Sequence, residues 1–377
     1  MNIKSKTNSK TLLVIIWNLG IGGVQKRIKD IAFDMTENHP HWQIILLVKN
    51  RQPQCFNHLL ESLSNVTIHY FSSVDSITHD RIIRRSPLPW ILTHIYLYNP
   101  TVCLSFLSHF SLLLVLYRLF VFWRKPIIVL NEVSQTTNYL HFHSSHPNME
   151  KWLIRLFYRF ADKIITPSKA GAKDLQQNYW VPPKKLTVIP NWTLFPPTKP
   201  SKKIYDLMYI GRFEPEKNIS ALIETVLILK KSFPHLRLAL VGEGSLEMSL
   251  KETVKELSLN QNIVYLKTTS NLMSLLKQAK IFVIASQSEG LPNVVLEAGM
   301  GQIPTIANHF AGAEEVILHG KTGYLTNSPK EMAAFISRIL SHTSITNQLG
   351  KAAEKYILQN FHKKTQDLFI QTLIKSA

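Results

Sequence analysis

Two glutamates, Glu289 and Glu297, lie eight residues apart in the segment SQSEGLPNVVLEAGMGQIPTIA. The apolar run IFVIAS at 281–286 comes just before them and predicts a buried strand of a parallel sheet. Glu289 then lies in the loop after the strand, and Pro292 suits the first position of the next helix. Ligands of open α/β sheets bind at this edge, where the free amides of a helix N-terminus attract anions and hydroxyls. Because a phosphate would repel carboxylates, the pair suits sugar hydroxyls; an unrelated surface pair is the alternative.

A basic motif, IGRFEPEKN at 210–218, follows a second strand-like run. Arg212 lies at the end of that strand and Lys217 at the start of the next helix, so both are placed to converge on one anion. A guanidinium offers a planar fork to phosphate and an ammonium a compact charge. Two unrelated surface cations are the alternative, which the position after a strand disfavours.

Two glycine-rich turns follow other predicted strands. In NLGIGGVQK at 18–26, Gly22 and Gly23 allow the backbone to approach a ligand closely before a helix begins. This turn lacks the spacing of a dinucleotide-binding G-x-G-x-x-G fingerprint. In VGEGSLE at 241–247, Gly242 gives a tight turn at the edge of the second sheet, open to a base or a ribose.

Strand-like runs alternate with helical patterns along the whole chain, which predicts an α/β fold of two Rossmann-like, doubly wound parallel sheets facing across a cleft. The predicted strands are 11–17, 43–48, 66–70, 101–106, 126–130, 163–166 and 186–189, then 205–210, 236–241, 263–266, 281–285, 303–306 and 323–325. The predicted helices include 24–37, 148–160, 218–232, 246–258, 270–279, 331–341 and 346–360.

The proline-rich segment NWTLFPPTKPSKK at 191–203 predicts an extended linker between the domains. The N-terminal domain is expected over 1–195 and the C-terminal domain over 196–361. The amphipathic segment 362–377 is a candidate to pack back on the first domain.

Charge and cysteine content restrict the class of protein. The chain has 377 residues, a formal net charge of +18 and only two cysteines, Cys55 and Cys103, which excludes a disulfide framework and suits a reducing cytoplasm. Residues 1–200 hold 23 Lys and Arg against 10 Asp and Glu, so the first half carries most of the charge. Such a half attracts anionic lipid or nucleic acid.

Basic residues flank aromatic and aliphatic stretches between 81 and 125, as in interfacial helices, which favours an anionic membrane surface over nucleic acid. The run FSLLLVLYRLFVFW at 110–123 is too short and too charged to span a bilayer. Either it contributes to peripheral attachment at the cytoplasmic membrane face or it is a buried core helix.

Together GGVQK, GRFEPEKN, VGEGSLE, SEGLPNVVLEA and HGKTGYL, in this order and spacing, resemble glycosyltransferase family 4, a retaining family with the GT-B fold. The resemblance is strong over 160–377 and looser before. It implies a nucleotide-diphosphate sugar donor, UDP more often than GDP, with Arg212, Lys217 and the Gly22 and Gly23 amides on the diphosphate. Glu289 would contact the donor sugar and Glu297 the ribose. The implied contacts of the helix N-terminus come from Gly290, Leu291, Asn293 and Val294.

Negative charge develops on the leaving β-phosphate, so fixed cations or a divalent ion must stabilise it. The chain has no Asp-x-Asp and no evident metal-ligand spacing. Arg212 and Lys217 therefore predict a metal-independent enzyme with no other cofactor.

The first domain departs from the family pattern where many relatives carry a histidine. The matching loop, IIVLNEVSQTT at 127–137, has Glu132 as a candidate catalytic residue for the donor sugar or the acceptor. His109, at another strand end, is the second candidate.

These observations predict a hexosyl- or N-acetylhexosaminyltransferase that acts on a lipid-linked or cell-surface glycan acceptor, in lipopolysaccharide, capsule or similar polysaccharide synthesis. A related GT-B nucleotide-sugar epimerase and a basic nucleic-acid-binding protein are the alternatives. An epimerase needs no lipid surface, and no known DNA-reading motif is evident in the sequence.

Overall fold

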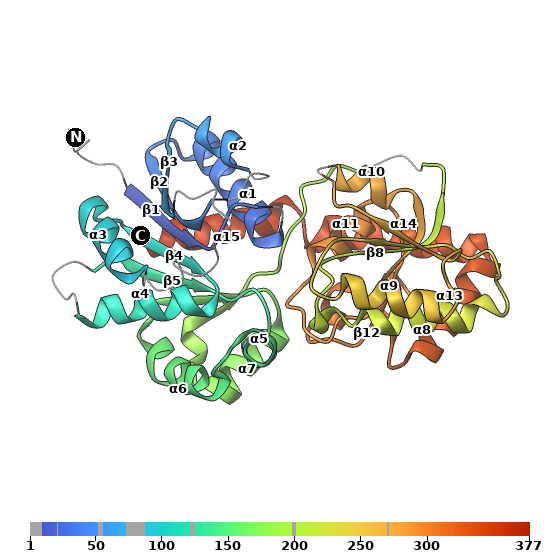
Figure 1. Cartoon of the computed structure of the whole chain (residues 1–377). Helices are drawn as coiled ribbons and strands as arrows, with labels where there is room; N and C mark the ends of the chain where they lie inside the picture. The colour runs from blue at the N-terminus through green and yellow to red at the C-terminus, as the bar shows by residue number, and fades with distance from the viewer. Residues whose placement is uncertain are drawn as a thin grey trace.

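Two parallel sheets with helices on both faces organise the chain into two lobes (Figure 1). The computed structural model describes residues 10–20, 22–51, 56–72, 87–120, 125–197, 201–269 and 271–377. Arg81, Arg84, Arg85, Arg124 and Cys55, on which some sequence predictions rest, lie outside these ranges.

The first sheet has seven parallel strands in the order β3-β2-β1-β4-β5-β6-β7, and each contains or overlaps a predicted strand. Its central strands are continuous apolar runs because helices cover both faces. Buried residues of β1 such as Leu13 and Val14 therefore contribute to opposite faces of the core. The strands are β1 (Lys10–Ile16), β2 (Trp42–Asn50), β3 (Val66–Ser72), β4 (Val102–Phe106), β5 (Ile127–Asn131), β6 (Lys163–Thr166) and β7 (Leu186–Val188).

The helices of this lobe fill the crossovers between parallel strands. They are α1 (Gly23–Asn38), α2 (Asn57–Glu61), α3 (Leu88–Tyr98), α4 (Ser108–Phe120), α5 (Thr136–His143), α6 (Pro147–Phe157), the short 3-10 helix η1 (Tyr158–Phe160), α7 (Lys169–Tyr179) and the 3-10 helix η2 (Pro183–Lys185).

Helix α4 decides between the two interpretations of the apolar run at 110–123. Phe110, Leu114 and Val115 are at most 3% exposed, and α6 packs against this helix. The described part of the run thus packs in the core of the first lobe, and its contribution to membrane attachment stays a prediction. Within the described ranges, no helix combines the length and apolarity needed to cross a bilayer.

The second sheet has six parallel strands in the order β10-β9-β8-β11-β12-β13, again at the predicted positions. The strands are β8 (Tyr205–Ile210), β9 (Leu238–Val241), β10 (Ile263–Leu266), β11 (Ala279–Ile284), β12 (Thr305–Asn308) and β13 (Gly323–Thr326). Its helical elements are η3 (Pro215–Lys217), α8 (Ile219–Lys230), α9 (Glu247–Glu256), α10 (Leu272–Leu276), α11 (Asn293–Met300), α12 (Ala313–Val316), α13 (Pro329–Ser341) and α14 (Thr343–Asn360).

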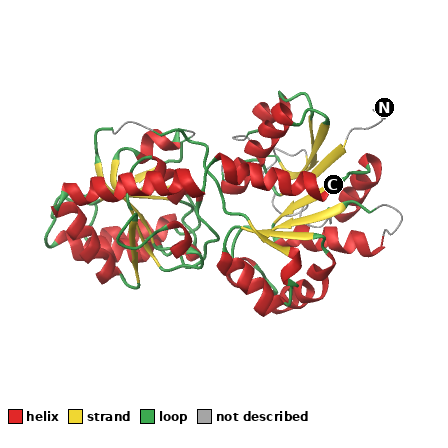
Figure 2. Cartoon of the chain, turned by 180° about the vertical axis from the view of Figure 1, so that it is seen from behind, coloured by secondary structure: helices red, strands yellow, loops and turns green. Residues whose placement is uncertain are grey.

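The chain passes between the lobes twice. After β7 it crosses to the second lobe, and after α14 it returns as α15 (Lys363–Ser376), which lies along the first lobe in both cartoon views (Figure 2). The Gln366 side-chain amide donates to the Asp30 carbonyl of α1 at 2.8 Å. Phe369 is fully buried in the first lobe's core, with its ring centroid 5.4 Å from that of Trp192. The C-terminal helix therefore fastens the two lobes together.

Candidate active site

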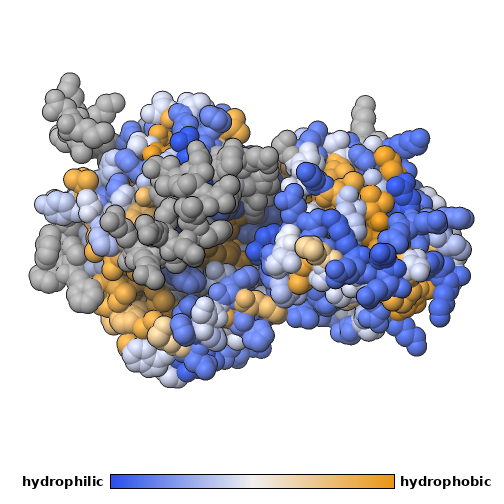
Figure 3. All heavy atoms as spheres, in the orientation of Figure 1, coloured by the Kyte–Doolittle hydropathy of each residue, from blue (hydrophilic) through white to orange (hydrophobic). Residues whose placement is uncertain are grey.

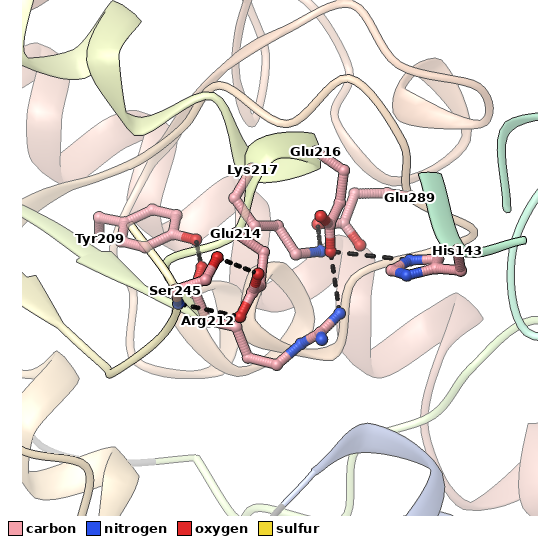
Figure 4. A network of polar contacts seen from close by, with 8 residues as sticks. All are labelled: His143, Tyr209, Arg212, Glu214, Glu216, Lys217, Ser245 and Glu289. Carbon is pink, nitrogen blue, oxygen red and sulfur yellow. Dashed lines mark hydrogen bonds and ion pairs between the residues drawn. The ribbon is translucent and has the colours of Figure 1, made fainter. Parts of the chain in front are cut away.

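Lys217 and Glu289 meet at the carboxyl edge of the second sheet. Strands β8 and β11 are neighbours, so the loops that follow them lie side by side. The Gln287 amide donates to the Glu216 carbonyl at 2.8 Å and holds these loops together. As a result the Lys217 Nζ lies 2.7 Å from Glu289 Oε1, and each side chain is only 15% exposed. The sequence predicted both residues at this edge, and the structure brings them together (Figure 4).

Arg212 comes from the same loop and faces the same space (Figure 4). Its Nη2 lies 2.9 Å from Glu216 Oε1, and its side chain is 62% exposed against 4% for that of Glu216. The Tyr209 hydroxyl donates to the Arg212 carbonyl at 3.0 Å. The loop is thus held rigidly while the guanidinium stays open to a ligand. A carboxylate of the same lobe pairs with each of the two cations.

Glu214 fixes this loop to the neighbouring one after β9. Its carboxylate accepts from the Ser245 amide at 3.2 Å and from the Ser245 hydroxyl at 2.7 Å. Partial burial opposes ionisation, but these two hydrogen bonds and nearby Arg212 hold the pKa of Glu214 below its ordinary value. Gly242, with φ +148°, is required here, since a Cβ would lie 1.9 Å from the Gly211 carbonyl oxygen. Gly242 thus packs the two loops together, and its predicted contact with the nucleotide stays a prediction.

His143, at the end of α5, brings the first lobe to this cluster (Figure 4). Its Nε2 lies 3.8 Å from Glu216 Oε1, across the space between the lobes. Burial lowers the pKa of His143; Glu216 opposes this and Arg212 reinforces it. Neither Glu216 nor His143 was predicted as a site residue. The only sequence signal was the histidine-rich stretch HFHSSH at 141–146, which carries no recognisable spacing.

Helix α11 starts one residue later than predicted, with Pro292 as its N-cap. Its first turn points toward the first lobe, because the Asn293 side-chain amide donates to the Gly23 carbonyl at 3.3 Å. Gly290, just before it, allows the lobes to touch: a Cβ there would lie 2.1 Å from the Val133 carbonyl oxygen. The N-termini of α1 and α11 therefore face the same interlobe space.

Glu297, in the middle of α11, is 2% exposed. Its Oε1 accepts from Lys26 Nζ of α1 at 2.5 Å, and its Oε2 has no hydrogen-bond partner although it is buried. Burial raises the pKa of Glu297, and Lys26 opposes that rise. A buried acceptor without a donor suits a ligand hydroxyl. Gly22, the extended N-cap of α1, and Gly23 lie one turn from Lys26.

Glu132 has its carboxylate turned into the first lobe. It accepts from the Tyr158 hydroxyl at 2.6 Å and from the Ser108 hydroxyl at 3.4 Å, and the residue is 3% exposed. His109 is half-exposed, with its Nε2 3.7 Å from Glu150 Oε1. The described contacts of both candidates are with the first lobe, and neither joins the ion pairs of Lys217 and Arg212. The direct role predicted for either in catalysis stays a prediction.

Within the described part of the chain, no cluster of three or more His, Cys, Asp or Glu side chains is arranged to hold a metal ion.

Comparison with known proteins relates the two lobes to two families. The model of "Glycosyltransferase Family 4" matches residues 21–193, and that of "Glycosyl transferases group 1" matches residues 191–356. Together they span both lobes and meet at the predicted linker.

Curated relatives resemble parts of the chain. It is 28% identical over 223 residues to the Campylobacter jejuni N-acetylgalactosamine-N,N'-diacetylbacillosaminyl-diphospho-undecaprenol 4-alpha-N-acetylgalactosaminyltransferase, covering 57% of this chain and 60% of that protein. It is 27% identical over 156 residues to the Staphylococcus aureus capsular polysaccharide biosynthesis glycosyltransferase CapM, covering 41% of each. The chain thus spans about half the length of the curated relatives it matches.

Solved structures resemble the whole chain. The Anabaena protein HepE in complex with UDP and glucose superposes with a TM-score of 0.78 at 17% sequence identity, over 97% of this chain and 99% of that one. At this identity the likeness shows the fold, and it confirms the predicted GT-B architecture.

Proposed function

The chain belongs to the family 4 type of GT-B glycosyltransferases, and we propose that it moves a sugar from a nucleotide-diphosphate sugar to a lipid-linked or cell-surface glycan acceptor. One observation carries the proposal: Lys217 and Arg212 lie beside Glu289 at the sheet edge that faces the first lobe. Two cations and a carboxylate at one edge suit a diphosphate joined to a sugar.

Lys217 is placed to contact both the residue proposed to bind the sugar, Glu289, and the diphosphate of the donor. An ammonium has three donors, so Lys217 can keep its bond to Glu289 and still donate to a phosphate oxygen. The diphosphate would then compete with Glu216 for Arg212, because a guanidinium can bind phosphate through two parallel N–H···O bonds and Glu216 holds it here through Nη2 and Oε1. Glu289, held by the same lysine, would be positioned against the sugar next to the β-phosphate.

The remaining predicted contacts follow from the interlobe space. The amides of Gly22, Gly23 and the first turn of α11 are placed for the diphosphate, and Glu297 Oε2 is a free acceptor for ribose hydroxyls. As the bond to the sugar breaks, Arg212 and Lys217 would neutralise the departing diphosphate without a metal ion. Retention of the anomeric configuration is proposed from the family resemblance.

Donor and acceptor classes are proposed by analogy. The HepE structure contains UDP, which favours a UDP-sugar donor, hexose or N-acetylhexosamine. The Campylobacter relative is named for a diphospho-undecaprenol acceptor, and CapM for capsular polysaccharide. A lipid-linked acceptor lies at a membrane, so we place the reaction at the cytoplasmic membrane face, where the basic first domain meets anionic lipid.

A panel of labelled UDP- and GDP-sugars tests the proposal. The purified protein is expected to hydrolyse one of them slowly without acceptor, and to keep doing so in excess chelator. Replacement of Lys217 by Ala should abolish this hydrolysis, whereas Lys280→Ala should not. Lys280 forms an ion pair of the same 2.7 Å length with Asp206 elsewhere in the same domain. Hydrolysis of none of the sugars, or equal hydrolysis by the Lys217 variant, would refute the proposal.

A further inference from the structure

The outer face of α6 is apolar although it is exposed. Met149 is 55% exposed, Trp152 60% and Phe160, in η1 directly after the helix, 40%, with partly exposed Leu156 between the last two. The spacing of three and four residues places these side chains in one stripe along the helix. The inner face packs on α4, with Ile154 fully buried. The helix therefore buries one apolar face and presents another to solvent.

Trp180 extends this stripe from the end of α7. It is 62% exposed and has φ +56°, a left-handed conformation in which glycine or asparagine is usual. Arg155 of α6 lies over its ring, with Cζ 4.6 Å from the ring centroid, and donates to the Asn178 carbonyl at 2.7 Å. A second exposed tryptophan is thus held against α6.

The segment that carries the stripe has an excess of positive charge. Residues 147–185 contain eight Lys and Arg but only three acids. Glu150 accepts from Ser144, Asp162 pairs with Arg118, and Asp174 accepts from Thr137, so each acid is engaged within the first lobe. Among the cations, Lys151 and Arg155 of α6 and Arg159 of η1 alternate with the stripe in the sequence, and the Lys185 Nζ donates to the Arg159 carbonyl at 2.5 Å.

The stripe starts a few residues along the chain from His143. His109, at the beginning of α4, lies 3.7 Å from Glu150 of the first turn of α6. The chain from His143, which faces Glu216, reaches α6 after only three residues. In the space-filling view, hydrophobic residues gather on the first lobe over α4, the helix on which α6 packs (Figure 3).

We propose that Met149, Trp152, Leu156, Phe160 and Trp180 form a docking surface for an anionic lipid bilayer. Tryptophan, methionine and phenylalanine beside lysine and arginine are the composition of a helix that lies in the bilayer interface. The apolar side chains enter the headgroup boundary, and the flanking cations pair with lipid phosphates. Docked this way, the first turn of α6 brings the lipid surface to the edge of the cleft. The inference rests on the proposed function in one respect: the purpose of docking would be access to a lipid-linked acceptor.

Vesicle flotation tests the surface without any donor or acceptor. The full chain is expected to float with vesicles of phosphatidylglycerol and phosphatidylcholine, less in high salt, and not with phosphatidylcholine alone. The double variant Met149→Gln with Trp152→Gln should lose on the order of tenfold or more in partitioning. Met248→Gln, in α9 of the other lobe and 76% exposed, is the matched control and should bind as the unchanged protein does.

Charge variants and tryptophan quenching test the docking surface in two further ways. Replacing Lys151 and Arg159 by Gln should weaken binding by about fivefold per charge, whereas Lys351→Gln with Lys355→Gln, exposed on α14, should not. Brominated lipids should quench tryptophan fluorescence, less so in Trp152→Phe and Trp180→Phe. Circular dichroism and slow hydrolysis of soluble donor report that each variant is folded.

The outcomes separate this inference from the proposed function. Vesicle binding lost only in the stripe variants supports the surface even if no nucleotide sugar is hydrolysed. The surface is excluded if the unchanged protein ignores anionic vesicles or if the stripe variants bind equally well. A concentration-dependent dimer that the stripe variants abolish, without vesicle binding, would assign the stripe to a second copy of the chain.

Discussion

Lys26 of the first domain and Glu297 of the second form an ion pair across the interlobe space, with Nζ and Oε1 2.5 Å apart. The ammonium also lies 4.0 Å from the ring centroid of Phe195, in the segment that joins the domains. One lysine thus contacts both the linker and the carboxylate that is predicted to bind the ribose. Through this side chain, the position of the domains is expected to affect the predicted donor site.

Replacement of Lys26 by Met should weaken UDP binding on the order of tenfold, because Glu297 loses the charge that orients its buried carboxylate and opposes the rise of its pKa. The loss should grow as the pH falls, since the pKa of Glu297 would rise further without Lys26. Calorimetric titration with UDP and with 2′,3′-dideoxy-UDP measures it: the variant should no longer distinguish the two nucleotides. Lys26→Arg should restore part of the distinction, and Lys29→Met on the same helix should leave it intact. Equal discrimination by Lys26→Met would contradict the coupling.

Lys217→Ala and Arg212→Ala should each reduce turnover on the order of 10²–10³-fold, as expected for the loss of one preorganised donor to developing charge. The lysine variant should also disturb Glu289, its 2.7 Å partner, so its kcat should fall more than its KM rises. Steady-state kinetics on the donor found by the panel measures both parameters. Ordinary rates from Lys217→Ala would exclude this lysine from the reaction.

Gly290→Ala should separate the domains, because the new Cβ would lie 2.1 Å from the backbone oxygen of Val133. Each domain should still fold, but turnover should fall about a hundredfold, the effect of a small misplacement of reacting groups. Kinetics together with thermal melting measures the two effects. Gly320→Asn is the control: a Cβ there meets nothing within 4 Å, and asparagine tolerates its φ of +74°. An active Gly290→Ala enzyme would show that this contact does not set the domain spacing.

The sequence predicted the strands, and it predicted the part of the site that lies in the second domain for a related physical reason. Continuous apolar runs identify strands buried on both faces, and the carboxyl ends of parallel strands must share one edge. Lys217 and Glu289 follow two such strands, so their proximity did not depend on any detail of packing.

The contacts between domains could not be predicted in this way. The pair of Lys26 and Glu297, and that of His143 and Glu216, depend on how two independently folded sheets are oriented. That orientation depends on contacts such as the close approach of Gly290 to the Val133 carbonyl. No periodic pattern in the sequence predicts such a contact. Likewise, the helix at 148–160 was predicted, but its second apolar face was not. An apolar residue that packs on α4 and one that faces solvent look the same in the sequence.

Phe369→Ala should destabilise the first domain by about 3–5 kcal/mol, the cost of removing a large buried side chain. Phe369 is fully buried among first-domain residues although it belongs to the C-terminal helix. Denaturant unfolding followed by tryptophan fluorescence, to which neighbouring Trp192 contributes, measures the loss. Leu368→Ala, 48% exposed in the same helix, should change stability little. Equal, small effects of both substitutions would mean that α15 is not fastened to the first domain.

Glu132→Gln should make the protein more stable at neutral pH and remove part of its pH dependence. Burial raises the pKa of Glu132 above its ordinary value of 4.5, against the hydrogen bonds from Tyr158 and Ser108. The folded chain therefore holds a proton that the unfolded chain has released, and stability must fall as the pH rises from about 4.5 through the folded pKa. Melting temperatures of the two proteins should agree below that window and diverge above it, with the Glu132→Gln variant the more stable. Glu243 is exposed, so Glu243→Gln should leave the melting temperature unchanged both below and above that window. The Glu132→Gln variant also distinguishes a structural role of Glu132 from a catalytic one. Retained turnover would leave Glu132 as a support for the Val133 loop. Lost turnover in a stabilised protein would make it a participant in the reaction.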